Sequence, residues 1–591
     1  MTYTKYYQDE LIALRELGKE FAEKNPALAP FLDTPGRDPD VERILEAFAF
    51  LTGRLRQKID DELPEIVHSL FNLLWPNYLR PIPATSIIRY EPSSNKAGIE
   101  SIPRGSIVRS IMVEGTHCLF KTAYDVEILP IQLIQHSFLE KDGEASLVLK
   151  FKALGAPLGN IPLSSLRFFI HGEPAISRTI YYSMVAKTQQ VRLVLHDKNG
   201  KSATALSLSA KECIRPVGFS EEEGLYPYPA NTFPGYRILQ EYFSLPEKFL
   251  FVDVVNLDKG FNRYILSDYN HTDEFELHFV MPDLPDSFES FRLENWQLFC
   301  TPVINLFKMD ASPLELDHRQ TEYRIIPEPR NPYSYTPYSI DSMGAYGNTK
   351  KADKIYDEFE SFEHETSGSN SHLYYRRHIR PSNKDGAPET YISFTQHPVI
   401  SQMLKSETIT IELTCTNRNL PQKLGVGDIC IPDDNSLIDI PFRNITPVTP
   451  PLNPPLEGDI LWRLLSNMSL NYISLTSISA LKSIISAYDF RALHDRPRAK
   501  ILKAILKGML SISCQQTDRL HNGLPIRGMR TTLVLDQRSF SCEGDMYLFG
   551  SVLSEFFALY ATVNSFHQLI VVEAKRGEEY QWPSRLGKIR M

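Results

Sequence analysis

The sequence lacks the features that would place this protein in a membrane or in an oxidising compartment. None of its apolar runs approaches the roughly 18 residues that a membrane-spanning helix requires. Its seven cysteines are odd in number, scattered, and without a C-x-x-C pair, so the sequence favours neither a disulfide framework nor a zinc site. The N-terminal stretch carries too many charges for a signal peptide. We therefore expect a cytoplasmic protein with reduced thiols.

The sequence also lacks a basic excess and any complete catalytic motif. Its formal net charge is −9, whereas nucleic-acid-binding proteins usually carry a clear excess of Lys and Arg. Gly200-Lys201-Ser202 imitates the end of a phosphate-binding loop, but Leu195 stands where that loop needs an earlier glycine. Motifs of zinc proteases, serine hydrolases and dinucleotide-binding enzymes are missing. We predict no catalytic residues, no cofactor and no nucleic-acid partner.

Two short clusters of metal-ligand residue types have simpler interpretations. Glu65 and His68 show the E-x-x-H spacing of di-iron helix bundles, but no second copy of this pair exists on another helix. Glu363-His364-Glu365 lies in a polar stretch, where a solvated charge cluster is the better explanation. We predict no metal site.

Length and composition predict an α+β protein of several domains. At 591 residues the chain is too long for one core, and its 41 prolines against 29 glycines indicate many rigid loops and edge strands. We expect an N-terminal amphipathic helical arm, central mostly antiparallel β modules and a C-terminal mixed α/β domain. The expected divisions are an arm at 1–86, β-rich modules at 87–330, a polar Tyr-rich loop or insertion at 331–395, a β segment at 396–445, a proline-rich linker at 446–455 and the C-terminal domain at 456–591.

The arm carries the strongest pattern in the sequence. Asp38 and Pro39 suit the start of a helix, and apolar residues then recur at spacings of 3, 4, 3 and 4. Pro64 predicts a new helix there, so we expect two helices joined end to end as far as Leu74. The apolar face is longer than a helix at 4–24 alone could cover. We predict a partner interface formed by Val41, Ile44, Phe48, Leu51, Leu55, Arg56, Asp60, Asp61 and Glu62.

The charged end of this set could also be cast as paired carboxylates for acid–base chemistry. However, Arg56 precedes Asp60 by four residues, as Lys58 precedes Glu62, and such i,i+4 pairs are ordinary on helix surfaces. A polar stripe facing solvent or a partner is the better explanation.

A second apolar helix is predicted in the C-terminal domain, between Met546 and Phe566. Leu548, Val552 and Phe556 form one row on it, and a neighbouring apolar row widens the face. We expect this helix at the centre of the domain, under a sheet. The proline-rich linker suggests that residues 452–591 can be expressed alone, with a surface for self-association.

An aromatic cluster offers an alternative function. Together with Glu241, Glu247 or Asp253 it could form the cleft of a glycoside hydrolase or of a carbohydrate-binding β protein. Aromatic core packing is the simpler explanation, and neither alternative needs a long helical arm. The cluster consists of Tyr226, Tyr228, Phe233, Tyr236, Tyr242 and Phe243.

Several sequence blocks resemble the TssF family (also called ImpG or VasA), a baseplate subunit of bacterial type VI secretion systems. They span nearly the whole chain, with the exception of 331–395. In one block Asn77 stands where many members have His. The blocks are Asp38–Arg43, Phe48–Leu51, Asp60–Glu62, Trp75–Pro81, Gly235–Phe243, Pro302–Phe307, Thr414–Arg418, Ser469–Tyr472 and Glu555–Tyr560.

The resemblance implies a structural, non-enzymatic protein of a contractile injection system. Family members are expected to join as two copies with one TssG in a baseplate wedge. The wedge connects to TssE, to TssK, to the spike and hub protein VgrG and to the base of the sheath and tube. It implies a cytoplasmic protein that is docked peripherally at the inner membrane through the baseplate and membrane complex, without inserting into the membrane itself.

Overall fold

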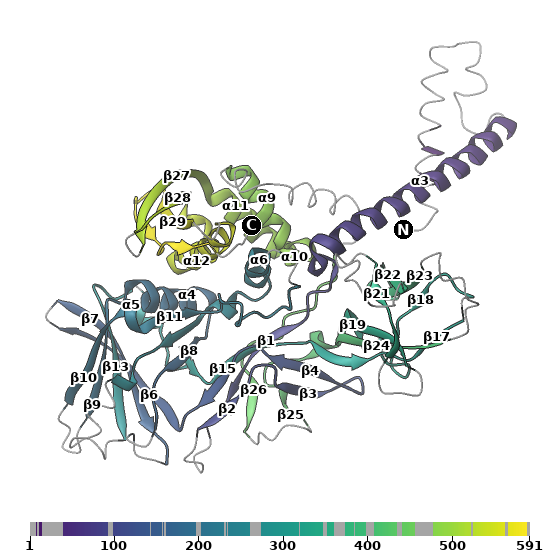
Figure 1. Cartoon of the computed structure of the whole chain (residues 1–591). Coiled ribbons are helices and arrows are strands. Elements are labelled where there is room, and N and C mark those ends of the chain that lie inside the picture. The colour runs from purple at the N-terminus through teal and green to yellow at the C-terminus, as the bar shows by residue number, and fades with distance from the viewer. Residues whose placement is uncertain are drawn as a thin grey trace, which may run out of the picture. The chain divides into compact units, whose positions relative to one another are not determined.

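The computed structural model shows an α+β protein of several sheets, most of them antiparallel (Figure 1). The chain divides into two compact units, one built mainly from residues 1–79 and the other mainly from 80–359, 363–454 and 467–591. The structure describes residues 7–8, 11–12, 14, 39–92, 99–141, 143–155, 158, 161–196, 202–229, 232, 234–259, 273–285, 287–317, 319–346, 352–359, 373–382, 384–396, 407–433, 440–454, 477–521, 524–561 and 565–587.

The arm is a single helix, α3 (Pro39–Leu74), of 36 residues. The predicted break at Pro64 is wrong, because the helix runs through it. A proline removes one backbone donor, and the turns on both sides keep theirs. The short 3-10 helix η1 (Pro76–Leu79) follows. Tyr78 stacks on Phe71, with ring centroids 5.3 Å apart, and lies 4.7 Å from the Trp75 ring. Of the first predicted helix at 4–24, most residues lie outside the described part.

The central β region consists of antiparallel sheets. One six-stranded sheet has the order β25 (Ile429–Pro432), β3 (Ile107–Val113), β4 (Thr116–Thr122), β15 (Cys300–Ile304), β1 (Thr85–Tyr90) and β26 (Phe442–Asn444). A five-stranded sheet has the order β10 (Ser202–Ser209), β9 (Gln190–His196), β13 (Glu274–Met281), β7 (Glu144–Ala153) and β6 (Ile131–Lys141). A four-stranded sheet comprises β11 (Ile214–Val217), β12 (Phe251–Val254), β8 (Leu166–Ile170) and β14 (Trp296–Leu298), and β2 (Glu100–Ile102) pairs with β5 (Val126–Ile128).

Short helices accompany these sheets. They are α4 (Pro174–Tyr182), the π-helix η3 (Ser183–Lys187), α5 (Ala210–Cys213), α6 (Gly235–Ser244) and the 3-10 helices η4 (Pro246–Phe249), η5 (Phe288–Ser290), η6 (Leu293–Asn295) and η7 (Leu420–Lys423).

Residues 331–395 were expected to form a loop or insertion, but they supply strands to two sheets. The prediction failed because tyrosines provide the missing apolar surface: Tyr338, Tyr356 and Tyr375 are all buried. One sheet has the order β16 (Phe307–Asp310), β24 (Glu407–Thr416), β19 (Thr336–Tyr346) and β20 (Ala352–Ile355), and β17 (Leu314–Leu316) also pairs with β24. The other has the order β18 (Tyr323–Arg324), β23 (Pro388–Gln396), β22 (Leu373–Pro381) and β21 (Asp357–Glu358).

The start of the proline-rich segment is attached to strand β1 along its length. The Thr85 amide donates to Thr449 Oγ1 at 2.8 Å, and the Thr449 amide donates to the Thr85 carbonyl at 2.8 Å. Ile82 and Leu452 exchange two backbone hydrogen bonds of 2.8 and 3.0 Å. These bonds attach residues 446–452 to the sheet edge, so this part of the segment is not a free linker.

The C-terminal region contains one sheet and four helices (Figure 1). Helices α9 and α11 contact strand β27 of this sheet, and helix α12 contacts strand β29. The sheet has the order β27 (Met509–His521), β28 (Leu524–Leu535), β29 (Phe566–Glu573) and β30 (Glu579–Gln581), with β31 (Arg585–Leu586) also on β29; β28 and β29 are parallel. The helices are α9 (Ile478–Tyr488), α10 (Phe490–His494), α11 (Arg496–Gly508) and α12 (Glu543–Tyr560), with the 3-10 turn η9 (Gln537–Ser539) before α12.

Helix α12 is buried from several sides, as its two apolar rows predict. Leu548, Val552 and Phe556 are fully buried, and the helix contacts β29. It also contacts α4 and α6, which precede it by more than 290 residues. An isolated fragment 452–591 would therefore expose the side of α12 that these two helices cover, and we no longer expect it to behave as an independent unit.

Candidate functional site: an exposed arm face and a buried polar centre

The apolar face of α3 is largely exposed where the structure describes it. Ile44, Phe48 and Leu51 lie on one side of the helix, and they are 68%, 54% and 59% exposed. Ala49 and Gly53, on the opposite side, are buried. Exposed apolar side chains gathered on one face are typical of an interaction surface. The side chains of the other predicted interface residues lie outside the described part: Val41, Leu55, Arg56, Asp60, Asp61 and Glu62.

A buried charge pair lies in the second unit, on α6 and on the 3-10 helix η4 that follows it. Glu241 and Lys248 are both 0% exposed and form an ion pair. The second Glu241 oxygen accepts a hydrogen bond of 2.7 Å from the Leu225 amide, and Lys248 Nζ donates to the Gly218 carbonyl at 2.8 Å. Burial lowers the pKa of Lys248 to about 8, while the charge of Glu241 opposes this shift.

The loop 218–226 closes over this pair. Arg237 Nη1 lies 3.6 Å from the Glu241 carboxylate, and Arg237 Nη2 donates to the Ser220 carbonyl at 3.0 Å. Gly218 has a φ of +106°, and a Cβ there would lie 2.9 Å from the Lys248 carbonyl oxygen. Only glycine fits this close approach without strain. The pair therefore fixes the loop against α6 and serves as a structural element.

The aromatic cluster proposed as a sugar cleft is mostly core. Tyr226, Tyr242 and Phe243 are nearly fully buried, and the Tyr242 ring lies 6.0 Å from that of Phe549 on α12. Tyr236 stacks on Tyr488 of α9 at 5.3 Å. Phe233 lies outside the described residues. Buried rings of this kind are unavailable to stack on a sugar.

The three carboxylates proposed for catalysis lie on α6, η4 and β12. Glu241 is buried in its ion pair, and Asp253 accepts two hydrogen bonds of 2.7 and 2.8 Å from the Arg167 guanidinium. Glu247 lies on η4, directly before the buried Lys248 in the sequence. Two of the three carboxylates are thus already engaged by cations of the same chain, which suits scaffolding roles.

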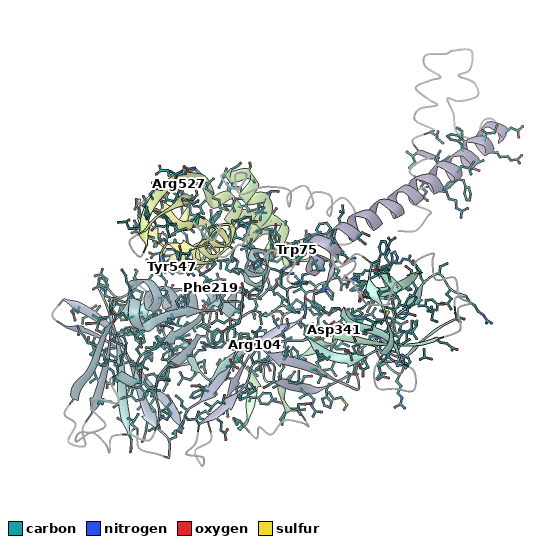
Figure 2. All side chains as sticks on the ribbon, viewed as in Figure 1. Trp75, Arg104, Phe219, Asp341, Arg527 and Tyr547 are labelled. Atoms are coloured by element: carbon teal, nitrogen blue, oxygen red, sulfur yellow. The ribbon has the colours of Figure 1, made fainter. Side chains whose placement is uncertain are left out.

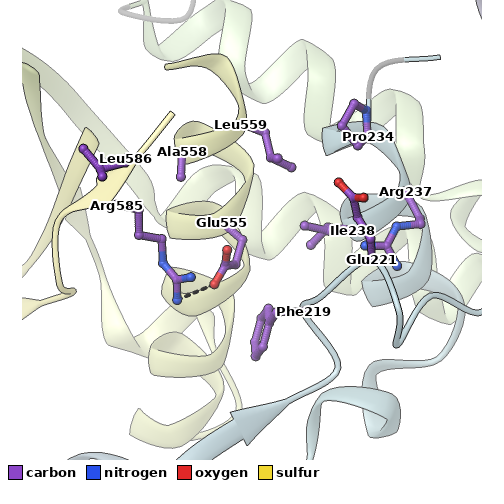
Figure 3. Close-up of a pocket in the computed structure, with 10 residues that line it drawn as sticks. All are labelled: Phe219, Glu221, Pro234, Arg237, Ile238, Glu555, Ala558, Leu559, Arg585 and Leu586. Carbon is purple, nitrogen blue, oxygen red and sulfur yellow. Dashed lines mark ion pairs between the residues drawn. The ribbon is translucent and has the colours of Figure 1, made fainter. Parts of the chain in front are cut away.

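Two blocks of the family resemblance meet at a small pocket between α6 and α12 (Figure 3). Arg237 and Ile238 come from one block, and Glu555, Ala558 and Leu559 come from the other. The cavity has a volume of about 80 Å³, and an ion pair between Glu555 and Arg585 lies at its edge. The pocket marks where the C-terminal helix joins the central region.

Two further blocks meet through buried asparagines. The side chain of Asn305 donates through Nδ2 to the Leu119 carbonyl at 2.7 Å and to Asn417 Oδ1 at 2.8 Å. The backbone amide of Asn417 donates in return to Asn305 Oδ1 at 2.7 Å. These bonds tie the six-stranded sheet to the sheet of β16, β24 and β19. The next residue, Arg418, has a φ of +52° and pairs with Asp385. Sequence reasoning missed Lys248 and both asparagines, because their partners lie on other elements and no local spacing signals them.

Most of the remaining sequence candidates lie outside the described residues. Gly200, Lys201 and Glu363–Glu365 lie outside the described residues, as does the side chain of Glu65. Across the described ranges, no group of three or more His, Cys, Asp or Glu side chains could hold a metal ion. No helix within those ranges is long and apolar enough to span a bilayer.

Comparison with known proteins gives consistent matches along the whole chain. A family model of the type VI secretion system protein TssF matches residues 2–589. Type VI secretion system component TssF1 of Pseudomonas aeruginosa is 27% identical over 630 aligned residues, which cover 99% of this chain and 98% of that protein.

Two solved structures of type VI secretion system baseplates contain chains that are similar to this one. A chain of the TssK-TssF-TssG baseplate subcomplex, determined by cryo-electron microscopy, gives a TM-score of 0.75 at 28% identity and covers 92% of this chain and 98% of its own. A chain of a type VI secretion system baseplate complex gives a TM-score of 0.62 at 25% identity and covers 99% and 100%.

Proposed function

The chain belongs to the TssF family of type VI secretion system baseplate subunits, and on this premise we propose that it acts as the scaffold of a baseplate wedge whose helical arm binds the partner subunits. The exposed apolar face of α3 carries this proposal. Ile44, Phe48 and Leu51 present apolar surface on a helix of 36 residues, and burying it against a partner is favourable by about 25 cal/mol per Å².

The partners are proposed from the similar assemblies and from the family. The structure with a TM-score of 0.75 comes from a complex of TssK, TssF and TssG, so TssG and TssK are the first candidates. We propose that two copies of this chain join one TssG, and that the wedge contacts TssE, the VgrG hub and the sheath base. In this arrangement the protein is cytoplasmic and reaches the inner membrane only through other subunits.

The nine arm residues are proposed as the contact set. Val41, Ile44, Phe48, Leu51 and Leu55 would form the apolar centre of the interface. Arg56, Asp60, Asp61 and Glu62 would form its polar rim, which sets register more than affinity.

Co-expression with TssG tests the proposal. Replacing Phe48→Asp together with Leu51→Asp places two charges in the apolar face, so complex formation should fall by at least about a hundredfold. Size-exclusion chromatography with light scattering gives the mass of the complex, and circular dichroism checks the fold of the variant.

The matched control replaces Arg43 and Arg54, which are exposed on the flank of the same helix, by glutamine, so its net charge also falls by two. This control should assemble like the unaltered protein. Normal assembly of the Phe48→Asp, Leu51→Asp variant would contradict an interface on this face, whereas loss of assembly in both variants would point to a general effect of charge on the arm.

A further inference from the structure

Helix α11 carries a stripe of basic residues along one side. Arg496, Lys500, Lys503 and Lys507 recur at spacings of 4, 3 and 4, which places them on one face of the helix. The stripe is about 16 Å long, from the rise of 1.5 Å per residue. All four residues are exposed, and the opposite side, with Leu502 and Ile505, is buried. Figure 1 shows α11 beside α9 in the green part of the C-terminal region.

The four basic residues of the stripe have no acidic partner within the described part of the chain. Neither an ion pair nor a side-chain hydrogen bond joins any of them to a described residue. The contrast with Arg498 on the same helix is clear, because Arg498 pairs with the buried Asp489 at 3.1 Å. The chain therefore neutralises the inward-facing arginine of α11 and leaves the outward-facing cations unpaired.

The stripe does not help the helix to form. Like charges three or four residues apart repel one another, and a cation in the first turn opposes the helix dipole. Arg496 is the first residue of α11 and lies at the unfavourable end, whereas Lys507 lies in the last turn, where the dipole favours a cation. These two effects oppose each other, so the repulsion between neighbouring cations remains, and an external anion would relieve it.

The charge of the chain is divided unevenly. Residues 477–591 contain 16 Lys and Arg against 10 Asp and Glu, a net charge of +6, whereas the remainder contains 47 against 62, a net charge of −15. A basic face within an acidic protein is a specific feature and not a consequence of general composition.

We propose that the basic stripe of α11 is a docking surface for an acidic helix on another protein subunit of the baseplate. This proposal rests on the proposed function, which supplies the assembly, but it concerns a different surface from the arm. Carboxylates at i, i+4 and i+7 on a partner helix would match the spacing of the stripe when the two helices lie side by side.

An anionic membrane fits this surface less well. Four cations without a lipid anchor or a broad apolar wedge give weak attachment, because stable membrane anchoring takes two signals. A protein helix requires only a local match, since charges farther away are screened beyond about 8 Å at physiological salt.

Charge reversal in the full-length chain tests the stripe. The variant combines Lys500→Glu, Lys503→Glu and Lys507→Glu, and the matched control combines Lys152→Glu, Lys211→Glu and Lys308→Glu, which are exposed on the β modules. Each protein is titrated separately with purified TssG, with TssK and with a tagged second copy of this chain. It is also titrated with phosphatidylglycerol vesicles, and circular dichroism melting verifies that each variant is folded.

We expect the stripe variant to bind one of the three proteins at least about tenfold more weakly, while the control binds normally. Affinity of the unaltered chain for that protein should also fall when salt rises from about 0.1 to about 0.5 M. Unchanged binding of the folded stripe variant to all three proteins would overturn the inference, as would stripe-dependent binding to vesicles alone. If the unaltered chain binds none of the three, the proposed function itself fails and this inference fails with it.

Discussion

Helices α3 and α12 carry apolar rows of similar spacing, but their surroundings differ completely. On α12, Leu548, Val552 and Phe556 are 0% exposed, because β29, α4 and α6 of the same chain surround the helix. On α3, Phe48 and Leu51 are more than half exposed. Periodicity therefore predicts a helix with an apolar face, but it does not tell whether the same chain or another one covers that face.

The largest expected effect comes from truncating the same residue type on both helices. Phe556→Ala should lower the free energy of unfolding of the C-terminal region by about 3 to 5 kcal/mol, because the cavity it leaves is fully enclosed. Phe48→Ala should change the stability of the isolated chain by less than about 0.5 kcal/mol, because its side chain is mostly in water. Hydrogen exchange of the amides in α12 and α3 measures both effects. Equal protection losses in the two helices would contradict the comparison.

The buried ion pair of Glu241 and Lys248 extends the comparison to polar residues. Glu241→Gln leaves Lys248 without its counter-charge in a fully buried site, and we expect a loss of about 3 to 5 kcal/mol. Glu241→Leu combined with Lys248→Met removes both charges and should recover most of that loss. Thermal unfolding of Glu241→Leu, of Lys248→Met and of the double variant gives the coupling energy. A double variant as unstable as Glu241→Gln would show that loop contacts, and not the ion pair, hold α6.

A smaller effect is expected from pH. His567, on β29 against α12, is 1% exposed and bonds to Thr531 Oγ1 at 2.9 Å, and burial lowers its pKa from 6.5 to about 4. The unfolded chain thus takes up a proton between these values before the folded one does. Stability should be complete above pH 6.5 and decrease by up to about 3 kcal/mol as the pH falls toward 4.

The matched variant for this test is His567→Gln, which keeps a polar partner for Thr531 but does not titrate. Its stability should be flatter over the same interval than that of the unaltered chain, as measured by thermal unfolding at several pH values. The arm variant Phe48→Ala should keep the full pH dependence. Identical pH profiles for His567→Gln and the unaltered chain would exclude His567 as the cause.

The sequence allowed the α+β class, the arm and the buried C-terminal helix to be predicted, because these depend on local periodicity. The sequence did not reveal the strands within 331–395, because this stretch has few aliphatic residues. Tyrosines such as Tyr338 and Tyr356 take their place and are buried in the structure. The C-terminal aromatic contacts were equally hidden. The ring centroid of Tyr547, which is labelled in Figure 2, lies 5.2 Å from that of Tyr182 and 5.1 Å from that of Trp582. Both partners are distant from Tyr547 in the sequence.

For the candidate site, the sequence indicated the apolar arm residues but not the polar centre. The sequence offers Glu241 as a possible catalytic carboxylate, but its partner Lys248 lies beyond the end of the helix, so no helical spacing links the two. The bond between Asn305 and Asn417 spans 112 residues. Contacts of this range depend on the packing of sheets, which a single sequence does not encode in any local pattern.

The attachment of residues 446–452 to β1 has a consequence for synthesis on the ribosome. Thr85 emerges 364 residues before Thr449, so a ribosome adding about 5 to 20 residues per second needs roughly 20 to 70 s to deliver the partner. During that time Ile87 and Ile88, both fully buried in the finished protein, belong to a strand whose second neighbour does not yet exist. The nascent chain therefore presents an incomplete apolar sheet to the cell for most of its translation, and it is a natural client for chaperones that hold such edges apart.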